Sequence, residues 1–477
     1  MQSLNDILKN LCLLDIRKPV ILGFSGGPDS MALADALDFL KFPFHAVHVN
    51  HRLRPEADDE EVLVREIARQ RGWSLSVEVV DCDSFARTSH RSVEDAARQL
   101  RYRALFATAE VHEAQAVITA HHADDQAETI LMHILRGSGL SGITGMHYRS
   151  LPNAWSNTIP LVRPMLDVWR TDILAYCEKK GLVTVHDSSN RDVGYLRNRI
   201  RWELLPNLES YNPKVKEHLV SLAKILHDDD QLLGLLADEA WLKCVREERE
   251  GFVRFSTQCL RMQSLPVIRR IFRRAAFQVV PGLNELDFSA VERLVDFLDS
   301  PTRTRRMNWM GGIQASMEGA FFVLYSPTAT RSGNFPQMTA DGVIKLDIPG
   351  RLDLGNGWTM EAFVEESTIA ENLSFTDPLM VYVDADKIQS PLSVRRFSSG
   401  DRFEPYGMPG TDIRLGDFFT NAHVPLRVRK TIPLVCHGRQ IIWVAGVRLA
   451  HFCRITETTR RIVCLRCYSV DEDCPAN

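Results

Sequence analysis

The chain has 477 residues, of which 45% are hydrophobic and 25% are charged, and its formal net charge is −4. This composition is typical of a globular protein with two to four domains, and it excludes a disordered chain and a bulk polycation. No apolar run reaches the ~18 residues of a membrane helix, and the N-terminus lacks the pattern of a signal peptide. We therefore expect a cytoplasmic protein without membrane contact, whose ten cysteines are mostly single thiols.

A glycine turn stands between a strand pattern and a helix pattern near the N-terminus. Residues 20–24 are apolar, residues 31–37 are helical in character, and Ser25-Gly26-Gly27-Pro28-Asp29-Ser30 lies between them. Glycines let the backbone approach phosphate oxygens, and the free N–H groups of a helix start attract the anion. The string has neither the Walker A spacing nor G-x-G-x-x-G. An ordinary strand-to-helix turn is the alternative, but the six-residue string favours a phosphate-binding loop.

Residues 1–205 alternate strand and helix patterns, which predicts an α/β domain with a doubly wound, mostly parallel sheet. In such sheets the ligand lies beyond the carboxyl ends of the strands. The phosphate loop follows the first strand, and polar residues follow two others. The predicted strands are 20–24, 44–49, 75–80 and 116–120, with helices near 30–40, 57–71 and 92–110.

The segment after the fourth strand combines histidines and acids. His121 and His122 leave the strand end, and Asp124, Asp125 and Glu128 open the next helix. Acids at a helix start are also good caps, which is the structural alternative. Three acids at a ligand-binding sheet edge nevertheless suit a hydrated Mg²⁺ with a triphosphate, because magnesium takes oxygen ligands. The histidine pair lacks zinc spacing, so we expect it to contact substrate or phosphate.

Two further segments offer arginines near the predicted site. In helix 92–110, Glu94, Arg98, Arg101 and Tyr102 share one face, and the arginines could clamp phosphates or carboxylates. A plain Glu94–Arg98 ion pair on a solvated helix is the alternative. Arg136 precedes a glycine-rich loop at 137–142, where a helix C-cap is the alternative for Gly137.

The rest of the chain predicts further domains: 206–330 mainly helical with a β-hairpin at 303–330, 331–384 a linker with short strands, and 385–470 a compact β-rich module. Residues 391–450 hold nine Lys and Arg against four Asp and Glu, which favours a phosphate-facing surface over a solvated charged face. Cys464 and Cys467 form a lone C-x-x-C, for which a buried strand is favoured over a metal site. The candidate nucleic-acid contacts are Arg395, Arg396, Arg402, Arg427, Arg429 and Lys430.

Together these motifs resemble the tRNA(Ile)-lysidine synthetases, a family of ATP pyrophosphatases with a pyrophosphate loop. The resemblance covers both ends of the chain, and the middle is similar mainly in helical character. One departure is Arg52, where the family more often has glycine. The matching segments are 25–30, 48–54, Glu94 with 97–98 and 101–102, 119–129, 135–139, 163–164, 187–190, 197–201, 400–403, 415–419, 424–425 and 442–446.

The resemblance implies an adenine nucleotide alpha hydrolase-like fold and a two-step reaction on a tRNA(Ile) with a CAU anticodon. The C2 oxygen of the wobble cytidine attacks the α-phosphate of ATP, and free L-lysine then displaces AMP to give lysidine. ATP and Mg²⁺ are the implied cofactors. The implied roles are ATP binding by Ser25, Gly26, Gly27, Pro28, Asp29, Ser30 and His51; metal binding by Asp29, Asp124 and Asp125; and catalysis by Asp29, Arg98, His122, Asp125 and Arg136.

The sequence leaves three other functions open. A 2-thiolation enzyme would need a cysteine set, whereas residues 1–205 hold only Cys12, Cys82 and Cys177. An amidotransferase synthetase domain would need a glutaminase, and a non-catalytic nucleotide- and RNA-binding regulator would not need Asp29 beside a second acid cluster. The lysine pocket, the tRNA identity elements, the active histidine of the pair and a homodimeric state are left open.

Overall fold

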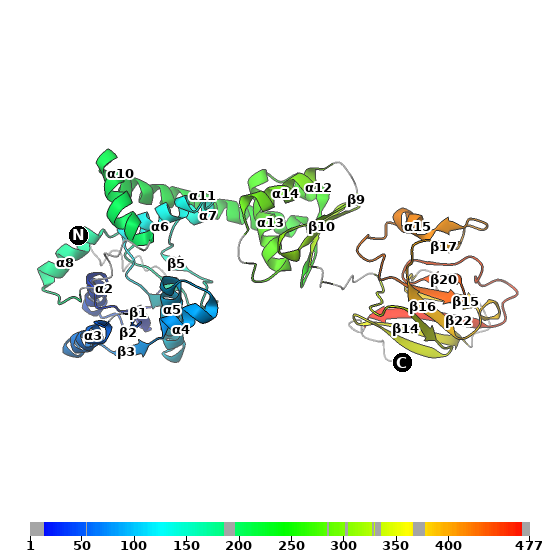
Figure 1. The fold of residues 1–477 in the computed structure, drawn as a ribbon, viewed down its shortest axis with the longest axis horizontal. Coiled ribbons are helices and arrows are strands. Elements are labelled where there is room, and N and C mark those ends of the chain that lie inside the picture. The colour runs from blue at the N-terminus through cyan, green and yellow to red at the C-terminus, as the bar shows by residue number, and fades with distance from the viewer. Residues whose placement is uncertain are drawn as a thin grey trace. The chain divides into compact units, whose positions relative to one another are not determined.

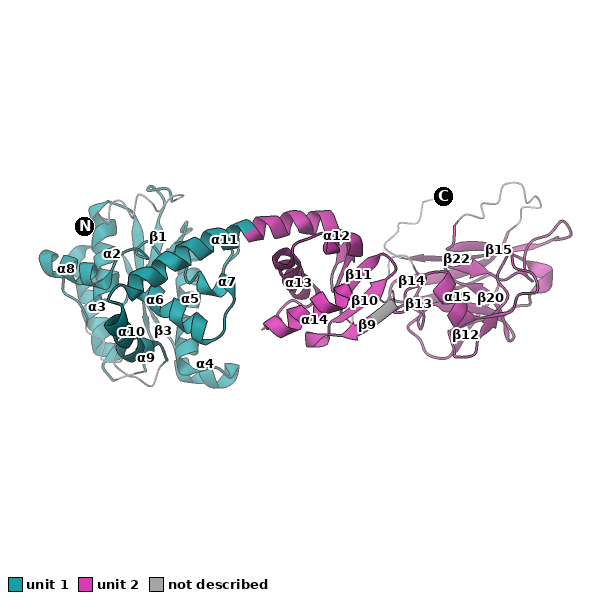
Figure 2. Ribbon diagram, turned by 90° about the horizontal axis from the view of Figure 1, so that it is seen from above, with its two compact units in different colours: residues 1–232 teal, residues 233–477 magenta. Residues whose placement is uncertain are grey.

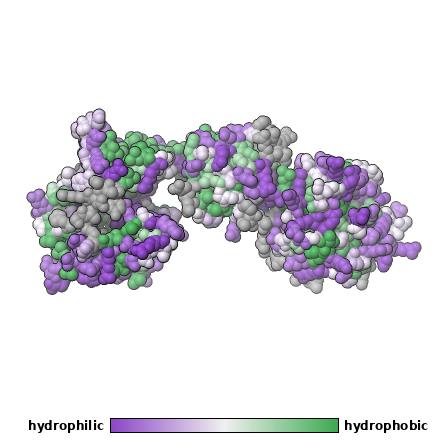
Figure 3. Space-filling model, in the orientation of Figure 1, coloured by the Kyte–Doolittle hydropathy of each residue, from purple (hydrophilic) through white to green (hydrophobic). Residues whose placement is uncertain are grey.

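The computed structural model describes residues 14–53, 55–185, 196–283, 286–300, 304–326, 329, 335–365 and 377–469. It divides into two compact units, residues 1–232 and 233–477, and each is described by itself. Figure 2 shows that helix α11 (Val215–Cys244) belongs to both, because the boundary falls within it. None of the helices in these ranges is long and apolar enough to cross a membrane. Figure 3 shows hydrophilic residues over much of the visible face, with hydrophobic residues among them.

Unit 1 is built on a six-stranded sheet in the order β3-β2-β1-β4-β6-β5, which confirms the predicted mostly parallel α/β domain (Figure 1). Neighbouring strands are parallel except at the β5 edge. The first strand of the chain is therefore central, flanked by the second and the fourth. The strands are β1 (Val20–Gly23), β2 (Phe44–Asn50), β3 (Leu75–Val79), β4 (Val117–Ile118), β5 (Arg149–Ser150) and β6 (Leu161–Val162).

Helices cover both faces of this sheet. Apolar residues of α2, α3 and α8 form one core with β1 and β4, and α5 buries Tyr102, Leu105 and Phe106 against the other face. Helix α4 was not expected from the sequence. The helices are α2 (Pro28–Phe39), α3 (Ala57–Arg71), α4 (Cys82–Ser89), α5 (Val93–Val111), α6 (Ala123–Leu135), α7 (Leu140–Ile143), α8 (Arg170–Lys180), α9 (Leu196–Arg199), a π-helix (Ile200–Leu204) and α10 (Leu205–Tyr211).

The first part of unit 2 packs three helices on an antiparallel sheet in the order β7-β8-β11-β10-β9. The sequence predicted a hairpin here, and the structure has a five-stranded sheet. Cys244 and Cys259 form a disulfide, so the expectation of single thiols is wrong for this pair. The elements are β7 (Val245–Arg249), β8 (Phe252–Ser256), α12 (Thr257–Arg261), α13 (Leu265–Val279), α14 (Phe288–Asp299), β9 (Thr304–Asn308), a 3₁₀ turn (Met310–Gly312), β10 (Gln314–Glu318) and β11 (Phe321–Tyr325).

The C-terminal part of unit 2 is β-rich, with two sheets around one core that includes the fully buried Trp443. Cys464 and Cys467 lie buried in its strand β22, and burial raises the pKa of Cys464 to about 12. The elements are β12 (Val343–Leu346), β13 (Gly350–Gly355), β14 (Trp358–Glu365), β15 (Met380–Asp384), a 3₁₀ turn (Ala385–Lys387), β16 (Leu392–Arg396), β17 (Arg402–Phe403), β18 (Ile413–Arg414), α15 (Leu415–Asn421), β19 (Pro433–His437), β20 (Gln440–Val444), β21 (Arg448–Leu449) and β22 (Ile462–Ser469). The predicted domain boundaries at 205, 330 and 384 stay predictions.

Candidate active site

The phosphate loop follows β1 and leads directly into α2, as predicted. Gly27 caps the helix and Pro28 stands in its first turn, where the missing N–H costs nothing. Gly26 has φ +79°, and a Cβ there would lie 2.8 Å from methyl groups of both Val64 and Val185. The Val185 N–H also donates to the Gly26 carbonyl, at 2.9 Å. Gly26 is therefore required both by its backbone conformation and by the close packing around it.

Two serine side chains form hydrogen bonds within the loop. Ser25 Oγ accepts a hydrogen bond from the Gly27 N–H at 3.3 Å, and Ser30 Oγ donates to the Gly27 carbonyl at 3.1 Å. The two hydroxyl oxygens are 3.2 Å apart. These bonds within residues 25–30 fix the loop conformation at the start of α2.

Asp29 is the charged residue of this loop, and its side chain is partly buried. Its Oδ1 atom is buried and has no hydrogen-bond partner among the described residues. Burial raises the pKa of Asp29, which the positive charge of nearby His122 partly offsets. A buried carboxylate oxygen without a partner is costly unless a cation or donor meets it.

His122 connects the loop to the fourth strand, because it caps α6 and faces Asp29. The His122 N–H donates to Asp125 Oδ2 at 3.1 Å, and the Asp125 N–H donates to His122 Nδ1 at 3.4 Å. The other ring nitrogen, Nε2, faces the phosphate loop. That nitrogen lies 3.8 Å from Asp29 Oδ2 and 3.4 Å from Asp125 Oδ2. The structure therefore brings together three residues that the sequence predicted to be catalytic.

Asp125 and Glu128 are bound by two arginines that the sequence reasoning did not assign to the site. Arg197 reaches Asp125 at 2.8 Å and Glu128 at 2.9 Å, and Arg201 reaches them at 3.0 and 3.1 Å. Burial alone would raise the pKa of Asp125, but the charges of His122 and Arg197 hold it well below its usual range. The sequence carries a signal for this pairing in its spacing. Arg197 and Arg201 are four residues apart and Asp125 and Glu128 are three residues apart, so each pair lies on one face of its helix.

Asp124 is also engaged on both of its oxygens. Lys216 Nζ lies 3.2 Å from Oδ1, and the Arg170 N–H donates to Oδ2 at 2.9 Å. Lys216 additionally pairs with Glu209 at 2.9 Å. Asp124 is therefore already neutralised by a lysine from α11.

These contacts decide how well the predicted metal set fits Mg²⁺. The described residues contain no group of three His, Cys, Asp or Glu side chains arranged to hold a metal ion. Asp124 and Asp125 are compensated by bases, whereas the partnerless oxygen of Asp29 fits a cation ligand. Of the three predicted ligands, Asp29 is the one whose surroundings favour a metal.

Arg98 and Arg136 are the other two residues that the sequence predicted to be catalytic, and the structure places them on different helices. The guanidinium groups of Arg98 and Arg101 lie 5.1 and 5.5 Å from the Tyr102 ring, so the predicted shared face exists. His121 Nδ1 is 2.8 Å from Thr119 Oγ1, and burial holds the pKa of His121 well below its ordinary value. Arg136 is exposed at the opposite end of α6 from His122, about 20 Å away along the helix. The structure does not bring Arg136 to the reaction centre.

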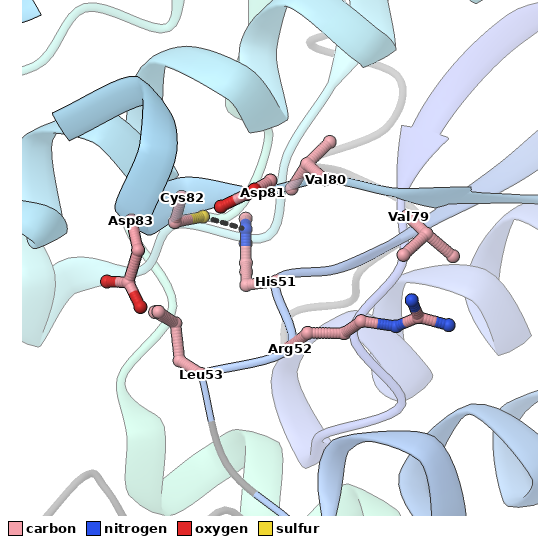
Figure 4. Close-up of a pocket in the computed structure, with 8 residues that line it drawn as sticks. All are labelled: His51, Arg52, Leu53, Val79, Val80, Asp81, Cys82 and Asp83. Atoms are coloured by element: carbon pink, nitrogen blue, oxygen red, sulfur yellow. Dashed lines mark hydrogen bonds between the residues drawn. The ribbon is translucent and has the colours of Figure 1, made fainter. Parts of the chain in front are cut away.

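His51 lines a cavity of about 320 Å³ at the carboxyl ends of β2 and β3. Figure 4 shows the His51 ring directed at the sulfur of Cys82, with 3.4 Å between Nδ1 and Sγ. The next residue, Arg52, has φ +48°, a left-handed conformation that glycine adopts at no steric cost. This conformation gives a physical reason for the glycine that the resembled family has at this position.

Most of the predicted nucleic-acid contacts in unit 2 are engaged within the unit. Arg395 forms a double ion pair with Asp401, and the others bond to neighbouring acids or backbone carbonyls. Lys430 is exposed. The partners are Asp341 and Met338 O for Arg396, Asp412 for Arg402, Glu318 for Arg427, and Val424 O with Thr420 for Arg429.

The loop, the sheet order and the charged strand ends define an ATP-binding domain of the PP-loop class, and a family model described as a PP-loop domain matches residues 1–208. A second model, described as the TilS substrate C-terminal domain, matches residues 392–464. The chain belongs to the tRNA(Ile)-lysidine synthase family, since the Geobacter sulfurreducens relative of that name is 32% identical over 94% of this chain and 92% of its own.

A second relative carries the same name, and one solved structure is similar to the C-terminal part of the chain. The tRNA(Ile)-lysidine synthase of Dehalococcoides mccartyi is 29% identical over 97% of this chain and 98% of its own length. A crystal structure of a TILS C-terminal domain is 25% identical, with a TM-score of 0.24, and covers 27% of this chain and 96% of that one.

Proposed function

We propose that the chain forms lysidine on the wobble cytidine of a tRNA(Ile) with a CAU anticodon, using ATP and free L-lysine. The observation that carries the proposal is the meeting of Asp29 and His122, 3.8 Å apart, at the mouth of the phosphate loop. Relatives matched over nearly their whole length carry the name of this activity. The rest of the proposal assigns roles to the residues around that pair.

ATP would lie along the carboxyl edge of the sheet. The loop of residues 25–30 offers backbone N–H groups and the start of α2 to the β- and γ-phosphates. The cavity beside His51 has a volume within the range of small-ligand pockets, so it suits the nucleoside part. In this proposed pose the α-phosphate would lie between the loop and the cavity.

The first chemical step transfers AMP to the C2 oxygen of the cytosine and releases pyrophosphate. Mg²⁺, when bound, would neutralise the charge that builds on the leaving oxygens, and Asp29 is the residue that would hold it. His122 Nε2 faces Asp29, and from this position it can donate a hydrogen bond to a phosphate oxygen in the transition state. Arg98 and Arg101 supply positive charge next to Tyr102 for the adenylated base.

In the second step the lysine amine attacks C2 and AMP leaves. The cytosine must be unpaired and extruded to reach the site, which an anticodon loop permits. The exposed cations of the C-terminal part are proposed to bind tRNA phosphates.

The deciding experiment incubates the purified protein with ATP, lysine and a tRNA(Ile) bearing CAU, with methionine tRNA as the control. We expect release of both pyrophosphate and AMP, with lysidine in the isoleucine tRNA alone. A sulfur requirement would indicate a thiolation enzyme, and release of neither product would indicate a binding protein. Thiolation is disfavoured by Cys177, whose pKa burial raises to about 11, because a thiol of that pKa is a poor nucleophile at neutral pH.

A further inference from the structure

Lys216 occupies an unusual place for a lysine. It stands in the first turn of α11, and its side chain is only one-quarter exposed. Its Nζ lies between two carboxylates, 3.2 Å from Asp124 Oδ1 and 2.9 Å from Glu209 Oε1. A cation held between two acids away from bulk water loses rotamer freedom and hydration, so the contact needs a compensating reason.

The second oxygen of Asp124 shows what Lys216 makes possible. Asp124 Oδ2 accepts the Arg170 N–H at 2.9 Å and lies 3.8 Å from His122 Nδ1. His122 Nδ1 accepts the Asp125 N–H and the His122 N–H donates to Asp125 Oδ2, so these two residues cap the start of α6. Without Lys216, Asp124 Oδ1 would lose its cation, and the carboxylate would no longer be fixed in the first turn of α6. The His122 ring, which lies 3.8 Å from both Asp124 and Asp29, would then lose the neighbour that holds its position.

We propose that Lys216 is a positioning residue for the adenylation step: by fixing and neutralising Asp124, it keeps His122 capped on α6 with Nε2 aimed at Asp29. This inference rests on the proposed roles of Asp29 and His122. Lys216 touches neither substrate nor reacting atoms, so it acts through Asp124 and the His122 ring.

The test is Lys216→Met, which keeps the apolar stem and removes the charge. In tRNA-dependent pyrophosphate release we expect kcat to fall about 10- to 100-fold, as for a small misplacement of a reacting group, with KM for ATP nearly unchanged. Lys216→Arg should restore most of kcat. Lys224→Met is the matched control, since Lys224 lies on the same helix and pairs with Asp167 at an exposed position.

A double variant keeps the inference testable even if Lys216→Met is unstable. Asparagine at 124 can keep the bond from Arg170 and needs no cation, so Lys216→Met with Asp124→Asn should be no slower than Asp124→Asn alone. The inference would be overturned if Lys216→Met kept the wild-type kcat or changed only KM. It would also be overturned if Lys216→Arg were inactive, or if the losses in the double variant were additive. Full activity in Asp29→Ala or His122→Ala would instead overturn the proposed function.

Discussion

The reaction centre of unit 1 and the basic C-terminal part of unit 2 both concentrate charge, but they use it differently. Around His122, the carboxylates of Asp124, Asp125 and Glu128 form ion pairs with Lys216, Arg197 and Arg201, whereas one oxygen of Asp29 has no hydrogen-bond partner in the described part of the chain. In the C-terminal part, arginines that were predicted to bind nucleic acid instead form ion pairs with acids of the same unit, as Arg395 does with Asp401 and Arg396 with Asp341. A count of charged residues therefore locates a functional region, whereas the ion pairs that those residues form decide which charges remain available to a ligand.

Asp29→Ala should have the largest effect and should separate the two regions. Losing this carboxylate removes the proposed metal ligand at the leaving group, so lysidine formation should fall about 10³-fold or more. tRNA affinity, measured by filter binding, should stay unchanged because the C-terminal cations are untouched. Near-normal lysidine formation would refute the role of Asp29, and a loss of tRNA affinity would refute the separation.

Glu128→Ala should destabilise unit 1 strongly. Its side chain is 1% exposed and pairs with Arg197 and Arg201, so removing it leaves buried positive charge uncompensated. We expect a loss of about 3 kcal/mol in the free energy of unfolding, measured by urea titration. Glu203→Ala is the control, because Glu203 forms an exposed pair with Arg199 worth at most about 1 kcal/mol. Equal losses in both variants would contradict the buried network.

The acid sensitivity of unit 1 should depend on Asp125. Its folded-state pKa lies below the ordinary 3.8, so its stabilisation is fully present above that value and is lost as the pH falls through the folded pKa. Wild-type stability should therefore decrease between about pH 5 and pH 2, and Asp125→Asn should show a flatter dependence over that window. Parallel curves from urea titrations at several pH values would show that Asp125 is not responsible.

The smallest effect is expected at Lys430. A phosphate-contacting lysine adds about one unit to the slope of log affinity against log salt, so Lys430→Glu should weaken tRNA binding several-fold and reduce that slope. Arg396→Gln is the control, since Arg396 is engaged by Asp341 and should leave the slope unchanged. Charge reversal at Arg395 is a poorer test because it would also break the Asp401 ion pair. An unchanged slope in Lys430→Glu would exclude Lys430 from the interface.

Much of unit 1 could be predicted from sequence because its signals are local. The apolar run 20–24 and the string 25–30 predicted β1, the loop and the start of α2. The helix over 92–110 is confirmed as α5, with Ser92 accepting from the Asp95 N–H at the N-cap. The short strand β6 was not predicted, because two buried residues are too few to show the alternating apolar pattern of a strand.

The site was harder to predict because its pairings are long-range. The sequence predicted Asp124, Asp125 and Glu128 as a magnesium set, but Arg197, Arg201 and Lys216 contact them from 69 to 92 positions away. The same limit applies to Arg395, whose attraction for phosphate depends on whether Asp401 already holds it. Spacing along one helix shows which residues share a face, and it does not show what packs against that face.

The central place of β1 has a consequence for biosynthesis. Ile21 pairs with His45 on one side and with Val117 on the other, so the strand made early needs a partner almost a hundred residues later. The loop that follows is packed by Val185, which comes later still. A chain emerging from the ribosome therefore holds its phosphate motif long before it can bind a nucleotide, and ATP protection against proteolysis should appear only in fragments that extend past Val185.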